Sequence, residues 1–192
     1  MHNPTDLFRQ WYAQATHNSP LQHPKAVCVS TVNQKGEPEA RFVALKEVSE
    51  AGFTFCSAFD SPKGLEIDTN PNVALTFWWD HTGRQVRVVG TATRISDEEA
   101  DRYFAERHKD AQITSLVSKQ SQPLERLEDL EARLREAEMK FAGREVPRPK
   151  NWGRYCVRPK RLEFLTFRAN RLHERTLFTC SAEGWSKQRL QP

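Results

Sequence analysis

The stretch Arg41-Phe42-Val43-Ala44-Leu45-Lys46 decides the predicted fold of this 192-residue chain. Its residues favour β-strands, and it has a cation at each end. Because side chains alternate between the two faces of a strand, Arg41 and Lys46 leave it on opposite sides. Each cation can then contact a different anionic group. The alternative for this stretch, taken alone, is a half-exposed strand with solvated ends.

Further short strands follow one another along the chain and are separated by turns. Runs of β-forming residues bounded by turn residues predict strands over residues 26–32, 39–48, 53–57, 73–79, 84–95, 162–167, 176–180 and 185–190. Successive strands joined by short turns favour an antiparallel sheet that is closed or nearly closed into a barrel. We therefore expect a single α+β domain over residues 1–192.

Peripheral helices are expected around this barrel. Apolar residues at helical spacing predict a helix over residues 7–15, and Ser96 with Glu99 forms a capping box that starts another helix near Asp97. A leucine-rich stripe predicts a packing helix over residues 124–141, which could alternatively be a partner interface.

A short helix is also predicted to start at Ser61, because serine caps helices well and Pro62 suits the first helical position. The start of a helix offers free backbone N–H groups and a partial positive charge, to which Lys63 adds a full charge. The start of this helix is therefore a candidate phosphate-binding site. An ordinary capped surface helix is the alternative.

The composition is that of a globular protein in water. Hydrophobic residues make up 38% of the chain and charged residues 28%, and no apolar run approaches the roughly 18 residues that cross a membrane. The first residues, Met1-His2-Asn3-Pro4, lack the charged and apolar segments of a secretory signal. We therefore expect a cytoplasmic protein without a membrane partner.

The charge pattern and the cysteines narrow the expected partners. The net charge of +4 suits an anionic partner, but Lys and Arg are interspersed with Asp and Glu, so a small phosphorylated ligand explains it as well as a nucleic acid does. The four cysteines lack the short paired spacing of a zinc site and are too few for a disulfide scaffold in a chain of this length. We expect neither a bound metal nor a nucleic-acid partner.

Three further positions have side chains suited to a small ligand. Tyr103 and Arg107 are four residues apart in the helix that starts near Asp97, so they would share one face and could clamp a phosphate. A surface Tyr/Arg pair is the alternative. Gln85 lies early in its strand, where its amide could hydrogen-bond a heterocycle or could simply be exposed.

The segment Arg171-Leu172-His173-Glu174-Arg175 follows a turn at Ala169 and Asn170. If this segment is extended, its three basic groups at alternate positions share a face. One imidazole framed by two guanidiniums is an uncommon grouping, which makes the segment a candidate for an active site. An exposed basic strand end is the alternative.

Together these stretches resemble the pyridoxine/pyridoxamine 5′-phosphate oxidase family, whose members are FMN enzymes of vitamin B6 metabolism with a split β-barrel. The similarity covers nearly the whole chain, from about Leu7 to the end. The matching residues occur in the family's order and spacing: Arg41 to Lys46, Lys63, Gln85, Tyr103 with Arg107, Ser118-Lys119-Gln120-Ser121, Trp152-Gly153, Arg171 to Arg175, and Arg189-Leu190-Gln191-Pro192.

The resemblance implies a role for each matched position. The substrate phosphate would be bound by Lys46, Tyr103 and Arg107, while Arg171 and His173, as the catalytic residues, would orient the pyridine ring over the flavin. FMN would be held by Arg41, Phe42, Val43, Ala44, Leu45, Lys46, Cys56, Ser57, Lys63, Gln85, Gln120, Ser121 and Arg175.

The resemblance also implies a homodimer with two active sites at its interface. Gln120 and Ser121 would reach an FMN held mainly by the other subunit, and residues 150–192 would form the dimerisation and active-site section. The implied reaction is oxidation of pyridoxamine or pyridoxine 5′-phosphate to pyridoxal 5′-phosphate. Hydride passes from the substrate's C4′ to the flavin, and O2 reoxidises the flavin to give hydrogen peroxide. With the amine substrate, the imine formed is hydrolysed to pyridoxal 5′-phosphate and ammonia. The cofactor supplies the redox chemistry, and the protein supplies position and charge.

Four positions depart from the family pattern. Pro62 replaces an Arg beside Lys63, Ala111 replaces a Ser that helps bind the substrate phosphate, Leu165 replaces a Trp near the flavin, and His23 replaces an Asp near the substrate. The chain also starts after the basic N-terminal segment that covers the site in some members. Two alternatives therefore stay open: a paralogue that oxidises another small molecule, as in phenazine pathways, and a non-catalytic binder of FMN or pyridoxal phosphate.

Overall fold

The computed structural model describes residues 3–192, so Met1 and His2 of the expected domain lie outside the described residues. The strands are β1 (Ala26–Val32), β2 (Pro38–Val48), β3 (Phe53–Ala58), β4 (Asn72–Trp79), β5 (Arg84–Arg94), β6 (Trp152–Thr166), β7 (Glu174–Ser181) and β8 (Gly184–Leu190). The helices are α1 (Pro4–Thr16), α2 (Pro62–Thr69), α3 (Asp97–Ala105), α4 (Lys109–Val117) and α5 (Leu127–Lys140), with a 3₁₀ turn at Asp80–Thr82.

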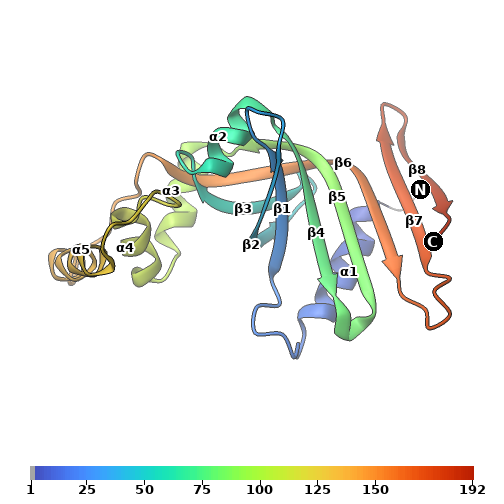
Figure 1. Cartoon of the computed structure of the whole chain (residues 1–192), viewed down its shortest axis with the longest axis horizontal. Helices are drawn as coiled ribbons and strands as arrows, with labels where there is room; N and C mark the ends of the chain where they lie inside the picture. Colours follow the sequence, from blue (N-terminus) through green and yellow to red (C-terminus); the bar gives the residue numbers. More distant parts are fainter. Residues whose placement is uncertain (1–2) are drawn as a thin grey trace.

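Six of these strands close into a barrel. The hydrogen-bonded order is β3-β2-β1-β4-β5-β6-β7-β8, and β3 also pairs with β6, which closes the ring. Each of these pairings is antiparallel. Figure 1 shows β7 and β8 as a hairpin that continues the sheet beyond the barrel. The predicted α+β class and the antiparallel split barrel are confirmed.

Strand β6 joins the barrel to the hairpin and is longer than predicted. Its first part pairs with β3, its last part pairs with β7, and β5 follows it along nearly its whole length. The sequence predicted only residues 162–167 as a strand, because Pro159 and the basic residues around it interrupt the β-forming pattern. The structure places Pro159 opposite Gly90 at a register shift, and such irregularities are where strands tolerate proline.

The helices differ from the prediction at one functionally important point. The helix capped by Ser96 ends at Ala105, and a separate helix, α4, begins at Lys109. The expectation that Arg107 lies on the same helix as Tyr103 is therefore wrong. The leucine-rich helix, expected over residues 124–141, is confirmed as α5 but begins at Leu127.

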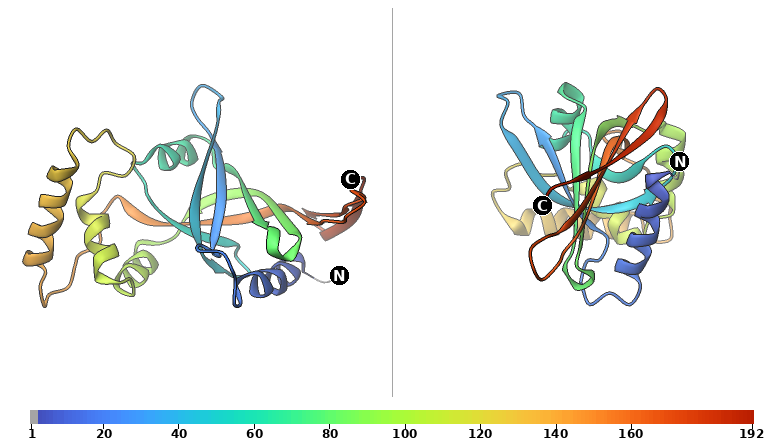
Figure 2. Two further views of the ribbon diagram at one scale, coloured as in Figure 1. Left: turned by 60° about the horizontal axis from the view of Figure 1, so that its bottom comes forward. Right: turned by 90° about the vertical axis from the view of Figure 1, so that its right-hand side faces the viewer.

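Two hydrophobic clusters hold the structure together. The larger fills the barrel and is closed at one end by α1, whose Phe8 is fully buried against Phe53 and Phe77. The smaller packs α3, α4 and α5 around Trp152 at the start of β6. Figure 2 shows these helices at one end of the long axis and the β7–β8 hairpin at the other.

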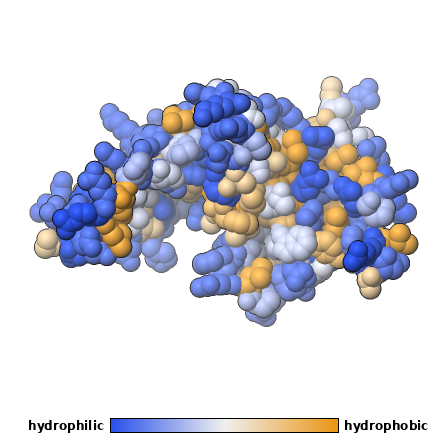
Figure 3. All heavy atoms as spheres, viewed as in Figure 1, coloured by the Kyte–Doolittle hydropathy of each residue, from blue (hydrophilic) through white to orange (hydrophobic). Residues whose placement is uncertain are grey.

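The outer face of the barrel leaves large apolar side chains in contact with solvent. Phe42 on β2 is 75% exposed and Trp78 on β4 is 55% exposed. Figure 3 shows apolar side chains gathered near the middle of this face, between the helices and the hairpin. Among the described residues, no helix combines the length and the apolar character needed to cross a membrane.

Candidate active site

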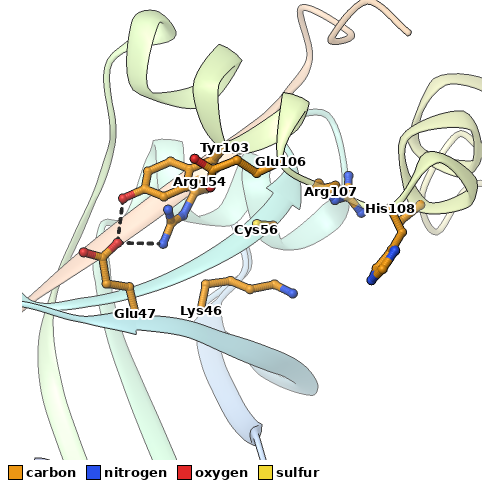
Figure 4. A pocket seen from close by; sticks show the side chains of 9 residues that line it. Lys46, Glu47, Cys56, Tyr103, Glu106, Arg107, His108 and Arg154 are labelled. Atoms are coloured by element: carbon orange, nitrogen blue, oxygen red, sulfur yellow. Dashed lines mark hydrogen bonds and ion pairs between the residues drawn. The ribbon is translucent and has the colours of Figure 1, made fainter. Parts of the chain in front are cut away.

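A pocket of about 570 Å³ lies where β2, β3 and β6 meet the segment from α3 to α4 (Figure 4). It brings together three predicted substrate-binding residues, Lys46, Tyr103 and Arg107, and the predicted FMN contact Cys56. The pocket is lined by Lys46, Glu47, Cys56, Tyr103, Glu106, Arg107, His108, Ala111 and Arg154.

A bulge in β2 determines how Lys46 and Glu47 face this pocket. Leu45 pairs with Phe55 and Glu47 pairs with Thr54, so the register shifts at Lys46. In a regular strand, consecutive residues point to opposite faces, but a bulge inserts an extra residue and re-aims its side chain. Lys46 and Glu47 therefore both line the pocket. The predicted separation of Arg41 and Lys46 also holds, since Arg41 turns to the other side and pairs with Glu66 at 3.0 Å.

Arg107 reaches the pocket from the turn between α3 and α4. One of its Nη atoms donates to the Oγ of Ser115 at 2.8 Å, and its guanidinium lies 4.7 Å from the centre of the Trp152 ring. Burial lowers the pKa of Arg107, although the group remains a cation near neutral pH. Ala111 lines the same pocket without offering a hydroxyl, whereas Ser115, one turn later in α4, does offer one.

Tyr103 and Arg154 form a second charged group on the opposite wall. The Tyr103 hydroxyl donates to the Glu47 carboxylate at 2.7 Å, and an Nη of Arg154 donates to the same carboxylate oxygen at 3.1 Å. The Arg154 guanidinium stacks on the Tyr103 ring, 3.4 Å from its centre. Burial raises the pKa of the nearby Cys56 thiol, which Arg154, Lys46 and Arg107 partly oppose. The thiol is therefore neutral near pH 7.

A smaller cavity of about 190 Å³ adjoins this pocket and shares Cys56 and Arg107 with it. The Gln120 side-chain oxygen accepts hydrogen bonds there from the Ala58 backbone N–H at 3.0 Å and the Ser57 hydroxyl at 3.4 Å. Gln120 thus lies beside Ser57 of its own chain, and its expected reach to an FMN held mainly by the other subunit stays a prediction. Ser121, expected to act with Gln120, is exposed and has a left-handed backbone.

Lys63 lies next to this cavity, at the start of α2. Its Nζ donates to the hydroxyls of Ser57 and Ser61, each at 3.2 Å, and the residue is 5% exposed. Burial and the charge of Arg41 lower the pKa of Lys63 to about 8, against an opposing contribution from Glu66. Among the described residues Lys63 forms no salt bridge, so a phosphate would supply the anion that this ammonium lacks.

The close approach of α2 to β3 depends on Gly64. A Cβ at this position would lie 2.2 Å from the Phe59 carbonyl oxygen, which no side chain tolerates. Ser61 caps the helix by accepting from the Gly64 N–H at 3.4 Å, and Pro62 is its first residue, as predicted. The sequence therefore brings a helix start, a buried ammonium and two hydroxyls to one point.

The middle of the 41–46 stretch faces other surroundings. Phe42, Val43 and Ala44 line a separate pocket of about 490 Å³ that also includes His23. Leu45 is buried in the barrel core. Within one chain, these four residues do not join Lys46 in the larger pocket.

The remaining predicted residues form a second group on β5, β6 and β7. Gln85 pairs with Leu165, which in turn pairs with Arg175, so the three lie in one row across the sheet. Two nitrogens of Arg175 donate to Glu163 at 2.9 and 2.7 Å, and Arg87 donates to the other oxygen of that carboxylate at 3.2 Å. Glu163 thereby fixes the direction of Arg175.

Arg171 and His173 lie in the turn between β6 and β7. Arg171 has a left-handed backbone with φ of 62°, so the condition that residues 171–175 are extended is met only from Glu174 onward. The His173 Nδ1 accepts from the Arg168 backbone N–H at 3.0 Å, which leaves Nε2 as the protonated nitrogen of the neutral ring. Figures 1 and 2 place this turn with the hairpin, at the far end of the molecule from α3 and α4.

Several residues in the larger pocket or beside it were not predicted from the sequence. Glu47 follows Lys46 and would face away from it without the bulge. Arg154 follows the recognised pair Trp152-Gly153, but nothing in the local pattern indicates that its side chain is buried under Tyr103. Ser115 lies on a helix that the sequence did not predict separately. A capping search at His108 would not have found that helix, since its N-terminus has no side-chain cap.

Sequence comparison relates nearly the whole chain to known proteins. A family profile described as "Pyridoxamine 5'-phosphate oxidase" matches residues 13–141, and one described as "Pyridoxine 5'-phosphate oxidase C-terminal dimerisation region" matches residues 152–192. The chain is 46% identical to a pyridoxine/pyridoxamine 5′-phosphate oxidase of Rubrobacter xylanophilus, over 99% of this chain and 87% of that protein. It is 43% identical to one of Sphingopyxis alaskensis, over 99% of this chain and 88% of that protein.

Solved structures share the fold. PhzG of Burkholderia lata, crystallised with tetrahydrophenazine-1-carboxylic acid, superimposes with a TM-score of 0.93 at 28% identity, covering 99% of this chain and 93% of PhzG. A protein of Nostoc punctiforme described as FMN-binding superimposes with a TM-score of 0.81 at 16% identity, covering 100% of this chain and 98% of that one. Because the profiles match most of the chain and the relatives align over nearly all of it, this chain belongs to the pyridoxine/pyridoxamine 5′-phosphate oxidase family.

Proposed function

We propose that this protein is an FMN-dependent oxidase that converts pyridoxamine or pyridoxine 5′-phosphate to pyridoxal 5′-phosphate, with O2 as electron acceptor. The observation that carries this proposal is the presence of two neighbouring sites that can bind phosphate. One is the buried ammonium of Lys63 at the start of α2, and the other is the pocket that contains Lys46 and Arg107. Cys56 borders the pocket and the small cavity that leads to Ser57. Two phosphorylated molecules can therefore be held side by side.

The residues around Lys63 fit the phosphate end of FMN. Two hydroxyls, a helix start and a cation that has no salt-bridge partner in the described part of the chain form a donor set that suits a dianion. Pro62 supplies no charge at the helix start, so Lys63 and the backbone N–H groups would bind the phosphate. When bound, FMN supplies the redox chemistry by accepting two electrons from the substrate and passing them to O2. The protein's own residues supply binding, orientation and charge.

In the larger pocket, Lys46 and Arg107 bind the substrate phosphate. Arg107 is held for this role by Ser115 and by the Trp152 ring, which limits the directions in which its guanidinium can point. Restricting the side chain in advance reduces the entropy lost when the phosphate binds. Tyr103 adds a hydroxyl donor once the Glu47 carboxylate releases it.

The site is completed by a second copy of the chain. Within one chain, the turn that contains Arg171 and His173 lies at the opposite end from Tyr103 and Arg107, so one small substrate cannot contact both groups. The match of residues 152–192 to a dimerisation region and the exposure of Phe42 and Trp78 support a homodimer. We place Gln85, Arg171, His173 and Arg175 of the second copy over the phosphate-binding sites at Lys63 and Arg107 of the first.

In this arrangement, the neutral His173 and the cationic Arg171 orient the substrate ring. The Nε2–H of His173 is free to donate, because Nδ1 is occupied by the Arg168 N–H. Arg175, fixed by Glu163, brings positive charge to the ring system of the flavin, where negative charge develops on reduction. None of these groups needs to change its charge during the reaction.

The proposal is tested on purified protein. We expect a yellow dimer whose flavin absorbance bleaches when pyridoxamine 5′-phosphate is added without oxygen and returns in air. Pyridoxamine without its phosphate is the matched control and should bleach the flavin much more slowly. A colourless protein, or a yellow one that no B6 phosphate ester bleaches, would exclude the assigned activity.

A second candidate is an oxidase of a tricyclic or other carboxylated substrate. The observations that favour it are the 0.93 TM-score with PhzG and the missing hydroxyl at Ala111. The same anaerobic experiment separates the two, because a phenazine-type oxidase would be bleached by a reduced phenazine carboxylate and not by pyridoxamine 5′-phosphate.

A further inference from the structure

The Arg154 side chain has fewer partners than a buried cation needs. It is 2% exposed, it donates to Glu47 through one Nη at 3.1 Å, and it stacks on Tyr103. Its Nε is the buried side-chain nitrogen or oxygen that has no hydrogen-bond partner among residues 3–192. A buried guanidinium is stable only when it is well paired, so this arrangement suggests a further anionic partner.

Glu47 differs from Arg154 because its side chain is accessible to solvent. Its side chain is 43% exposed, and it follows the bulge at Lys46. The same carboxylate oxygen accepts from both Tyr103 and Arg154, at 2.7 and 3.1 Å (Figure 4). This carboxylate therefore occupies the position that an oxygen of a bound phosphate would take between the phenol and the guanidinium.

The charge of the pocket agrees with this interpretation. Three cations, Lys46, Arg107 and Arg154, face two carboxylates, Glu47 and Glu106, so these five side chains have a net charge of +1. Turning Glu47 into solvent would leave a net +2 at the lining, which matches a phosphate ester dianion. If Glu47 stays in place, the pocket is matched only to a monoanion.

We infer that Arg154 is an additional anion-binding residue of this pocket and that Glu47 is an internal competitor, which the phosphate of the substrate displaces from Arg154 and Tyr103. This inference rests on the proposed function for the identity of the substrate, but not for the presence of an anion site. It makes Arg154 a fourth ligand of the phosphate, beside Lys46, Tyr103 and Arg107. Glu47 then sets how strongly the pocket discriminates between dianions and weaker anions.

The test measures anion binding to the purified holoprotein by calorimetry, with inorganic phosphate, pyridoxal 5′-phosphate and pyridoxal as probes. For Arg154→Met we expect affinity for both phosphate probes to fall by about tenfold to a hundredfold, with pyridoxal little affected. For Glu47→Gln we expect affinity for inorganic phosphate to rise severalfold, because the competing charge is gone. In the double variant, the gain from Glu47→Gln should disappear.

The control is Arg148→Met, which removes another largely buried arginine that pairs with two carboxylates, Asp97 and Asp101, and does not line the pocket. It should leave phosphate affinity unchanged. If Arg154→Met does not fold, Glu47→Gln still tests whether Glu47 competes with phosphate, since this variant keeps every cation of the pocket. Unchanged or weaker phosphate binding by Glu47→Gln, or equal losses for pyridoxal and its phosphate in Arg154→Met, would overturn the inference.

Failure of the proposed function would look different. Inorganic phosphate contains no pyridine ring and undergoes no redox step, so its binding reports on the anion site alone. If phosphate affinity responds as expected but pyridoxamine 5′-phosphate does not bleach the flavin, the anion site is supported and the proposed activity is excluded. If pyridoxamine 5′-phosphate bleaches the flavin but the Arg154→Met variant binds phosphate normally, the proposed activity is supported and the inference about Arg154 is excluded.

Discussion

The Nζ of Lys63 lies 3.2 Å from the Oγ of Ser57, inside the protein and away from solvent. Burial keeps the pKa of this ammonium at about 8, so the group loses its proton within an accessible pH range. Only the protonated form attracts a phosphate. Because Lys63 forms no salt bridge among residues 3–192, we expect its protonation state to affect the affinity for FMN under the proposed function.

We therefore predict that FMN binding to the apoprotein weakens as the pH rises through about 8. Titrations followed by quenching of flavin fluorescence, at several pH values on both sides of that point, measure the effect. Lys63→Met should bind FMN about tenfold to a hundredfold more weakly below pH 8 and should lose this pH step. Identical pH profiles for the two proteins would show that Lys63 does not contact the phosphate.

The same pKa shift predicts a change in stability with pH. In the unfolded chain Lys63 has its ordinary pKa of 10.5, whereas in the folded protein the value is about 8. Between these values the unfolded state binds more protons, so the contribution of Lys63 to the free energy of unfolding increases as the pH rises. Urea unfolding of apoprotein at pH values across this window should show the increase, and Lys63→Met should lack it. A steeper rise in the variant would contradict the assignment.

The strands were predictable from the sequence apart from the first part of β6, and the contacts between distant segments were not. Alternation on β2 correctly separated Arg41 from Lys46, and Ser61 with Pro62 correctly marked the start of α2. Alternation assumes a regular ladder, so it failed at the bulge that turns Glu47 toward Lys46. No local sequence pattern predicts that β6 brings the Arg154 side chain into contact with the Tyr103 ring.

The spacing of Tyr103 and Arg107 is a particular case of this limit. Four residues on a helix share a face, and both side chains do reach one pocket, but the helix ends at Ala105. The correct outcome arises from a different cause, because Ser115 and Trp152 hold Arg107 in place. Residue order along a family pattern was a better guide to this site than helical geometry.

Removing the Arg107 charge should weaken substrate binding and leave the cofactor in place. We expect Arg107→Met to lower affinity for pyridoxal 5′-phosphate about tenfold to a hundredfold, which is the cost of a lost charge-assisted hydrogen bond. Ser115→Ala should have a smaller effect in the same direction, since it frees the guanidinium without removing it. Calorimetry and the flavin absorbance at equal protein concentration provide the two measurements. Loss of flavin from Arg107→Met would place this residue in the cofactor site instead.

Substitutions at Arg171 need a backbone control, because its φ of 62° is unfavourable for most side chains. Arg171→Ala removes the guanidinium and keeps the Cβ and its backbone strain, whereas Arg171→Gly removes the guanidinium and relieves about 1 kcal/mol of that strain. We expect both variants to retain FMN and to slow anaerobic flavin reduction by a similar factor. If only the glycine variant is slow, the turn conformation matters and the guanidinium does not.

A charged residue at Trp78 should separate the two copies and thereby release the flavin. Trp78 is 55% exposed and packs on Phe167, with ring centres 4.8 Å apart, so Trp78→Glu would place a charge in the proposed interface without opening the barrel core. We expect a folded monomer, by light scattering and circular dichroism, with at least tenfold weaker FMN binding. The control is Met139→Glu on α5, where the wild-type side chain is 73% exposed and distant from the barrel strands. It should remain a yellow dimer. A dimeric Trp78→Glu protein with normal flavin content would place the interface on another face and would require Gln85 and Arg175 to act within their own chain.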